Sequence, residues 1–187
     1  MLLVSIGGIE HVPTRKTKFR RLLFSAEVVE MAGLLEVVFE FVDKGSVLPL
    51  LTEIINGAES VVSAQCSETF PVWRDCQIQL DAISAAINFE GEICVLVNVR
   101  NLKVRELIIS AVLVRVLRYD GMFDVDFSFD ENDVGLRGRA VLDALLTYSK
   151  EMAGKFEVAN CFYGIEPASN EDTRVFTNGV LGPLREK

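Results

Sequence analysis

The chain has few of the residues on which most enzymatic sites depend. Only one histidine, His11, occurs among the 187 residues, so a Ser-His-Asp or Cys-His arrangement would have to use it. The four cysteines, Cys66, Cys76, Cys94 and Cys161, contain no C-x-x-C pair, which disfavours a zinc site with mixed Cys and His ligands. We interpret them as reduced core residues of a protein in a reducing compartment.

Nucleotide-binding, hydrolase and membrane signals are also missing. No P-loop, G-x-G-x-x-G or G-x-S-x-G motif is present, and these motifs are the usual signs of phosphate cradles and nucleophile elbows. The first apolar run has no basic region before it and does not resemble a secretory signal. The longest apolar segment, residues 102–117, carries four charged residues and is shorter than the roughly 20 residues of a membrane span. We therefore expect a cytoplasmic protein with no membrane partner.

The chain is rich in hydrophobic residues and has more acidic than basic residues. Half of its residues are hydrophobic and a quarter are charged, which is typical of a globular protein, and the length suits a single domain over residues 1–187. The formal net charge is -8. This charge argues against nucleic acid as a partner, because phosphates would be repelled, and it is compatible with a basic protein partner.

Hydrophobic periodicity gives the secondary structure. Helices are predicted where apolar residues recur at helical spacing between capping signals, and strands where they alternate with polar residues. The predicted helices cover residues 46–56, 102–117 and 133–152. The predicted strands cover residues 2–9, 21–30 with 34–42 as a hairpin, 77–89 with 93–99 as a second hairpin, 122–129 and 156–163. Residues 58–74 are expected to meander, and residues 164–187 to form an irregular wrap around the sheet.

The segment at residues 102–117 is the ambiguous one. Its β-branched content favours a strand. Its polar positions Lys103, Glu106, Ser110 and Arg118 lie on one helical face, so we favour a helix packed on the sheet. The fold class that follows is α+β: a single domain with a mixed, mostly antiparallel sheet and about three helices packed on it.

The most prominent charged feature is a run of acids in and after the strand predicted at residues 122–129. Its members are Asp120, Asp124, Asp126, Asp130, Glu131 and Asp133. Alternation places Asp124 and Asp126 on one face of the strand and its phenylalanines on the other, so we expect one wet acidic face. Three interpretations are open: a solvated sheet face, an interface for a cationic partner, or a carboxylate site for a divalent metal. No EF-hand loop pattern is present.

The C-terminal segment Tyr163-Gly-Ile-Glu-Pro-Ala-Ser-Asn-Glu-Asp-Thr-Arg-Val-Phe-Thr-Asn-Gly-Val-Leu-Gly-Pro-Leu184 combines glycine and proline turns with a short capping box. Together with the acidic, small-domain character, it resembles the small cytosolic immunity proteins of bacterial toxin systems, including contact-dependent inhibition. The resemblance implies a protein that is not an enzyme, needs no cofactor, and binds and neutralises a cognate, often basic, toxin domain.

We therefore expect an immunity protein whose partner-binding residues are the six acids, from Asp120 to Asp133. The alternative is a small enzyme that uses carboxylates, with or without a metal. The oligomeric state and the identity of the toxin stay open at the level of the sequence.

Overall fold

The computed structural model describes residues 33–187 apart from 69–70, 76, 135–137 and 184–187. Gly33–Lys187 forms one compact unit. Its elements in chain order are β1 (Leu34–Val42), α2 (Lys44–Asn56), β2 (Ser60–Cys66), β3 (Trp73–Arg74), β4 (Gln77–Ile78), α3 (Leu80–Asn88), β5 (Ile93–Val104), β6 (Leu107–Tyr119), β7 (Met122–Asp130), the 3-10 turn η1 (Glu131–Asp133), α4 (Arg139–Lys155), β8 (Asn160–Ile165), the 3-10 turn η2 (Glu171–Thr173), β9 (Arg174–Thr177) and β10 (Val180–Leu181).

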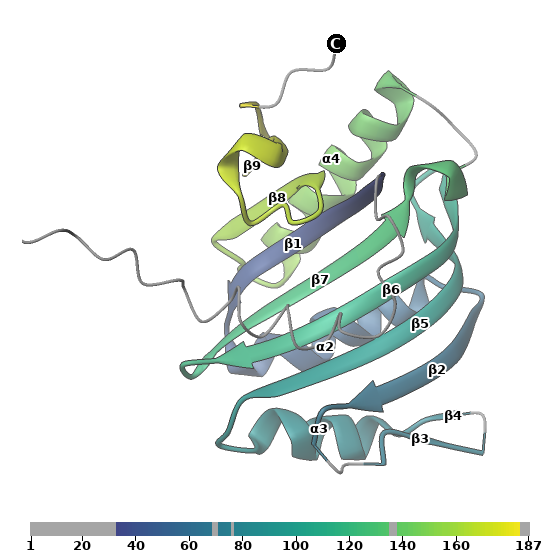
Figure 1. Ribbon diagram of the computed structural model, residues 1–187, viewed down its shortest axis with the longest axis vertical. Coiled ribbons are helices and arrows are strands. Elements are labelled where there is room, and N and C mark those ends of the chain that lie inside the picture. The colour runs from purple at the N-terminus through teal and green to yellow at the C-terminus, as the bar shows by residue number, and fades with distance from the viewer. Residues whose placement is uncertain (1–32, 69–70, 76, 135–137, 184–187) are drawn as a thin grey trace, which may run out of the picture. The chain divides into compact units, whose positions relative to one another are not determined.

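Eight strands form one antiparallel sheet in the order β10-β9-β8-β1-β7-β6-β5-β2. The strands β5, β6 and β7 follow one another as hairpins, drawn in teal and green in Figure 1. The strand β1 lies inside the sheet, with β7 along one edge and β8 along the other. The sheet therefore places the start of the described chain between two strands from its second half.

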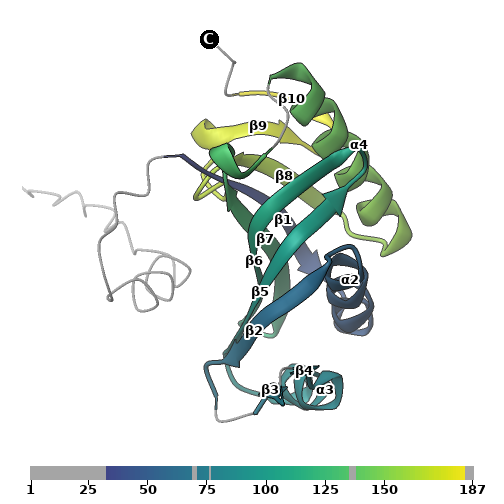
Figure 2. The same cartoon turned by 90° about the vertical axis from the view of Figure 1, so that its right-hand side faces the viewer.

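One face of the sheet packs against helices. Figure 2 shows α2, α3 and α4, the helices of the described part of the chain, on the same side of the sheet. Alternate residues of the central strands point to this side because successive side chains of a strand point to opposite faces. The fully buried residues of this face are Val37 and Phe39 on β1, Val95 and Val97 on β5, Val114 and Val116 on β6, and Val125, Phe127 and Phe129 on β7. We call it the helix-covered face.

The fold class is confirmed: within the described residues, three helices pack on a mostly antiparallel sheet in an α+β arrangement. The strands predicted at residues 34–42 and 122–129 are β1 and β7, and the first predicted helix is α2. That helix begins at Lys44, two residues before the predicted start, because Asp43 caps it: the Asp43 Oδ2 accepts the N–H of Gly45 at 3.1 Å. None of the helices in the described ranges is long and apolar enough to cross a bilayer.

The helix predicted at residues 102–117 is wrong. These residues belong to two long strands, β5 and β6, which pair in a continuous ladder from Ile93 opposite Arg118 to Val104 opposite Leu107. The turn between the strands is Arg105-Glu106, with Arg105 at a positive φ of 58°. This turn lacks the Asn or Gly that usually marks a two-residue hairpin, so no local signal indicated it. The β-branched content of the segment correctly indicated strands.

The strand predicted at residues 77–89 is also wrong beyond its first two residues. Only Gln77–Ile78 is extended, and Leu80–Asn88 forms the helix α3. Its buried residues Ile83, Ala86 and Ile87 recur at helical spacing. The polar-apolar alternation covers only the first six residues of the segment, so it was too short to define a strand.

Smaller differences lie at other boundaries. The segment expected to meander contains the edge strand β2, and the helix expected from Asp133 begins at Arg139, because Asp133 ends the turn η1. The strand expected at residues 156–163 begins at Asn160. The C-terminal segment, expected to be irregular, supplies the strands β9 and β10 at one edge of the sheet.

The strands predicted at residues 2–9 and 21–30 lie outside the described residues, so the single-domain assignment for 1–187 stays a prediction.

Candidate functional site

The six predicted acids do not form one exposed patch. Asp124 and Asp126 are buried, with relative exposures of 5% and 1%, so the expected wet acidic strand face is wrong for both. Glu131 is exposed, and Asp130, the last residue of β7, and Asp133, in η1, are half-buried. The exposed Asp120 lies before β7. A nine-residue strand with a rise of about 3.3 Å per residue separates it from Asp130 by roughly 30 Å.

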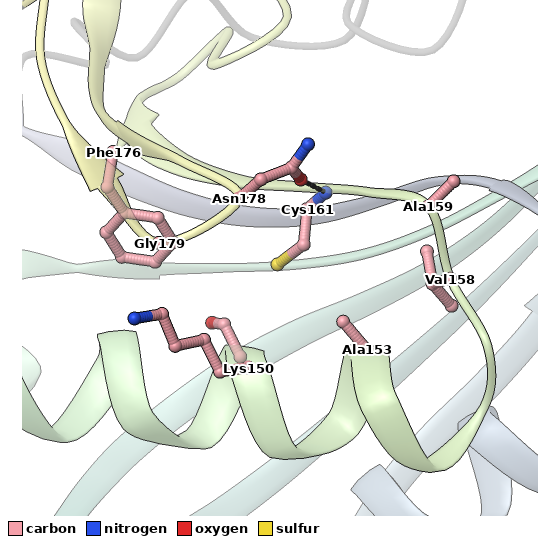
Figure 3. A pocket seen from close by; sticks show the side chains of 9 residues that line it. Lys150, Ala153, Val158, Ala159, Cys161, Phe176, Asn178 and Gly179 are labelled. Atoms are coloured by element: carbon pink, nitrogen blue, oxygen red, sulfur yellow. Dashed lines mark hydrogen bonds between the residues drawn. The ribbon is translucent and has the colours of Figure 1, made fainter.

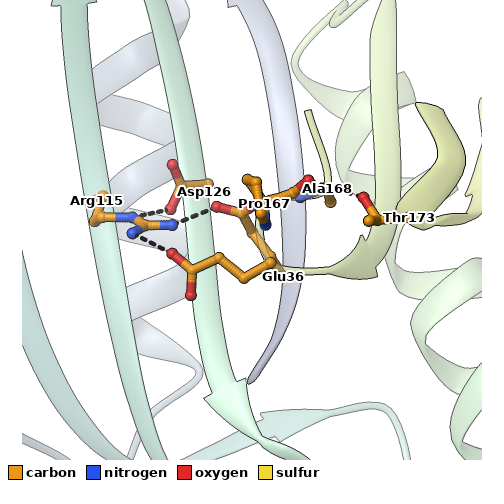
Figure 4. A network of polar contacts seen from close by, with 7 residues as sticks. Glu36, Arg115, Asp126, Pro167, Ala168 and Thr173 are labelled. Atoms are coloured by element: carbon orange, nitrogen blue, oxygen red, sulfur yellow. Dashed lines mark hydrogen bonds and ion pairs between the residues drawn. The ribbon is translucent and has the colours of Figure 1, made fainter. Parts of the chain in front are cut away.

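Asp126 is buried because it belongs to an ion-pair network on the face of the sheet opposite the helices (Figure 4). Arg115 lies directly opposite Asp126 in the register of β6 and β7. The Nε of Arg115 donates to Asp126 Oδ1 at 2.5 Å, and its second and third nitrogens donate to Glu166 Oε1 at 2.8 Å and to Glu36 Oε1. We call these four residues the Arg115 network, and the face that holds it the network face.

The electrostatics of the network keep Arg115 charged. Burial by itself would lower the pKa of its guanidinium, but the negative charges of Asp126, Glu36 and Glu166 outweigh burial and raise the pKa further above its ordinary value. A buried charge is tolerated only when it is paired and hydrogen-bonded. The network is therefore a structural element. Its side chains are buried, so a partner cannot contact them in this conformation.

Asp124 has a structural role of its own. Its Oδ1 accepts the backbone N–H of Phe41 at 3.1 Å, and its Oδ2 accepts the hydroxyl of Tyr119 at 2.8 Å. The register of β1 with β7 shifts between Phe39 and Val42, and Phe41 has a positive φ of 57°. At such a bulge the ladder leaves a backbone donor without its usual partner, and the Asp124 carboxylate accepts from it.

The network also fixes the segment that follows β8. Glu36 Oε2 accepts the backbone N–H of Ala168 at 2.8 Å, and the Thr173 hydroxyl donates to the Pro167 carbonyl at 2.8 Å. The guanidinium of Arg174 lies over the Phe162 ring, 4.1 Å from its centroid, and its Nε donates to the Ala168 carbonyl at 3.0 Å. The segment from β8 to β9 is thus held to the sheet by several short contacts.

These contacts bring two acidic turns to one end of the sheet. The register places Asp130 opposite Leu34 at the start of β1, and the Leu34 carbonyl accepts the N–H of Glu166 at 2.9 Å on the other side. The turn η1 follows β7 and the turn η2 precedes β9, so the two turns lie on either side of β1 and β8, about three strand spacings or roughly 14 Å apart. Their acids are Asp130, Glu131, Asp133, Glu171 and Asp172, and we call this surface the acidic end.

Sequence reasoning missed Glu171 and Asp172 as neighbours of the other acids, and it missed the Arg115 network altogether. The signal for the network was Arg115 itself, a single cation inside the apolar run Val112–Leu117. Once that run is read as a strand next to β7, Arg115 and Asp126 become cross-strand neighbours. The helical interpretation of the segment hid this pairing.

No metal-binding arrangement supports the carboxylate-enzyme alternative within the described ranges. No group of three or more His, Cys, Asp or Glu side chains there is placed to hold a metal ion. Cys66, Cys94 and Cys161 are free thiols, and burial raises the pKa of both Cys94 and Cys161 to about 12. His11 and the basic residues 15–21 lie outside the described residues.

Comparison with known proteins gives the family. A family model described as PABL017 Cdi1I immunity protein matches residues 33–180. The fold is similar to a chain of the crystal structure of the toxic C-terminal tip of CdiA from Pseudomonas aeruginosa in complex with immune protein. The TM-score is 0.69 at 29% identity, over 82% of this chain and 99% of that chain. None of the curated proteins matches. Since the family model spans β1 to the start of β10, the chain belongs to the PABL017 Cdi1I immunity protein family.

Proposed function

We propose that this chain binds and neutralises the toxic C-terminal tip of a CdiA-type protein, and that it does so by binding alone, without catalysis, in the cytoplasm. The observation that carries the proposal is the family match over residues 33–180. The similarity to a chain from a complex of a CdiA toxic tip with its immune protein, at 29% identity, supports it.

We place the contact with the toxin at the acidic end. The chain has a net charge of -8, and the acidic end gathers five carboxylates from two turns. Of the two arginines that follow these turns in the sequence, Arg139 is paired with Asp143 at 2.9 Å, and Arg174 adds a single positive charge against the five carboxylates. A cationic surface on the toxin would be attracted to such an end, which raises the association rate and fixes the orientation.

The acidic end is also preorganised. Asp130 Oδ1 accepts the N–H of Asn132 at 2.8 Å, and Asn170 Oδ1 accepts the N–H of Asp172 at 3.3 Å, so each turn is capped within itself. The ordering of a loop on binding costs free energy that a fixed loop does not have to supply. These caps and the Arg115 network support the acidic end as a recognition surface.

Charge reversal tests this placement. We expect the double variant Glu131→Lys, Asp172→Lys to slow association with the purified toxin domain by about tenfold at low salt and to flatten its salt dependence. Both side chains are exposed, so the fold should be unaffected. Biolayer interferometry at several salt concentrations measures the effect.

The matched control is the double variant Glu90→Lys, Asp120→Lys. It makes the same charge change at two exposed positions, before β5 and before β7, at the opposite end of the sheet. Equal slowing by the control variant would contradict the placement at the acidic end. Failure of the wild-type chain to bind the toxin domain would contradict the proposed function itself.

A further inference from the structure

A pocket of about 200 Å³ lies between α4 and the strands β8 and β9 (Figure 3). Its floor is formed by the buried residues Ser149, Cys161 and Phe176. Its mouth is formed by Lys150 and by the turn at Asn178 and Gly179. The volume is below the roughly 300 Å³ at which pockets for drug-sized ligands begin, so it suits a small chemical group. It lies at the opposite end of β8 from the acidic end.

The floor holds a polar group without a partner. The Ser149 side chain is buried, with a residue exposure of 1%, and its hydroxyl has no hydrogen-bond partner. A buried hydroxyl left unsatisfied is destabilising, and such groups in native proteins call for a ligand or an ordered water. The nearby Cys161 offers the Ser149 hydroxyl only a weak partner. Burial raises the pKa of its thiol to about 12, against the lowering effect of a side-chain hydrogen bond with Ser149, so the thiol stays neutral, and a neutral thiol is a weak donor and a weak acceptor.

The mouth is rigid and offers further donors. Asn178 exchanges two hydrogen bonds with Cys161: its N–H donates to the Cys161 carbonyl, and its Oδ1 accepts the Cys161 N–H, both at 2.7 Å. This leaves the amide NH₂ of Asn178 as a donor. A Cβ on Gly179 would lie 1.9 Å from Lys150 Cε, so the glycine lets the lysine chain lie against the turn.

The polar groups of the pocket lining are therefore mainly hydrogen-bond donors. It offers a hydroxyl, an ammonium group and an amide NH₂ above an apolar wall of Ala153, Val158 and Phe176, and none of its lining residues is a carboxylate. Lys150 has no ion pair within the described residues. A charge-assisted hydrogen bond to an anion is stronger than a neutral one. Ala153 lies in the last turn of α4, to which the unfavourable effect of the helix's negative end on an anion is confined, whereas Ser149 and Lys150 lie before that turn.

We propose that this pocket binds a carboxylate carried on a short aliphatic stem. The carboxylate accepts from the Lys150 ammonium and the Ser149 hydroxyl, and the stem packs against Phe176 and Val158. Such a group can come from a free short-chain acid or from a glutamate or aspartate side chain of a bound protein. The second source alone rests on the proposed function.

Titration of the isotope-labelled chain with butyrate, followed by NMR, tests the free source. We expect saturable shifts of the Ser149, Lys150 and Gly179 amides with butyrate and none with 1-butanol, which has the stem without the charge. Lys150→Met should weaken butyrate binding by about tenfold or more. The control Lys155→Met removes the same charge from the same helix, where Lys155 pairs with Glu53 at 2.9 Å, and should leave binding unchanged.

Ser149→Ala separates a ligand role from a structural one. Because the weak Cys161 thiol is the hydroxyl's nearest candidate partner in the protein, removal of the hydroxyl should leave the thermal midpoint equal or higher while weakening butyrate binding several-fold. A fall in the midpoint together with unchanged binding would contradict the assigned role of Ser149.

The toxin complex tests the protein-borne source. If butyrate gives no saturable shift but Lys150→Met weakens the toxin complex about tenfold more than Lys155→Met does, the carboxylate comes from the partner. If neither effect is found, the pocket holds water only and the proposal is overturned. The wild-type complex is measured first, so that an absent complex counts against the proposed function and leaves the butyrate titration to decide the pocket.

Discussion

The two faces of the sheet bury side chains of opposite character on the same strands. On β1, β6 and β7, the helix-covered face carries valine and phenylalanine. The network face carries, besides the apolar Val38, the buried polar residues Glu36, Arg115, Asp124, Asp126 and Ser128. The helix-covered face gains from removal of apolar area from water, which needs no particular geometry. The network face must match each charge to a partner, because an unmatched buried charge is strongly destabilising.

The two faces therefore contribute differently to the structure. Apolar packing provides most of the stability, while buried ion pairs contribute little net stability because the cost of desolvation offsets their attraction. The Arg115 network instead fixes where the segment from β8 to β9 lies, through Glu166 and through the bond from Ala168 to Glu36. That segment carries Glu171 and Asp172, so the network face positions part of the acidic end.

The largest expected effect comes from removal of the cation at the centre of the network. We expect Arg115→Met to lower the free energy of unfolding by about 3–5 kcal/mol, because three carboxylates would stay buried without their cation. Urea denaturation followed by circular dichroism measures this. Arg139→Met, which breaks an exposed i,i+4 pair with Asp143, should cost less than about 0.5 kcal/mol. A loss below about 1 kcal/mol for Arg115→Met would show that the faces do not differ as described.

Truncation on the helix-covered face provides the counterpart. Leu51 on α2 is fully buried in the apolar core, and we expect Leu51→Ala to cost about 3 kcal/mol through lost transfer energy and a cavity. Because no charge is involved, the cost should be the same at low and high salt. A strong salt dependence in the same urea measurement would speak against a purely apolar origin.

A smaller effect on stability is expected where the backbone at Gly164 lies close to the backbone at Thr173 on the network face. A Cβ on Gly164 would lie 2.1 Å from the carbonyl oxygen of Thr173, so only glycine lets that segment lie so near β8. We expect Gly164→Ala to cost about 2 kcal/mol by forcing the two backbones apart. Gly154→Ala is the control, since its Cβ would meet nothing within 4 Å, and it should be neutral or stabilising because alanine favours a helix. Thermal unfolding of both variants tests the contrast.

The two buried thiols, one on each face, are expected to have the smallest effect on stability. Burial raises the pKa of Cys161 on the helix-covered face, and of Cys94 on the network face, from 9.0 to about 12; the charge of Asp126 adds to the effect at Cys94. Below pH 9 the thiols are protonated in both states. Above it, the unfolded chain loses protons that the folded chain keeps, so stability falls as pH rises towards 12.

The expected slope is about 1.4 kcal/mol per pH unit for each thiol. Urea denaturation between about pH 10 and 11, above the unfolded pKa and below the folded one, measures it. The variant Cys161→Ala should remove one thiol's share of the slope, and Cys94→Ala should remove the other. An unchanged slope in either variant would show that the corresponding thiol titrates normally in the folded protein.

Local patterns in the sequence determined several parts of the fold. Strict alternation identified β7 and its buried phenylalanines, and helical spacing with a glycine stop identified α2. Both signals depend on periodicity within one element, which the chain carries whatever its neighbours are. The same reasoning failed for β5 and β6, because a hairpin turn of Arg105-Glu106 has no local signature and the polar positions fit a helical face by coincidence.

The placement of charge was decided only by the tertiary structure. Arg115 meets Asp126 across 11 residues, Glu166 across 51 and Glu36 across 79, and no local pattern links positions so far apart. The sequence by itself determined that acids are abundant near β7 and that the chain is a small α+β protein. Strand order and register then decided which carboxylates are buried against Arg115 and which gather at the acidic end, because a side chain's exposure depends on what packs over it and not on its own polarity.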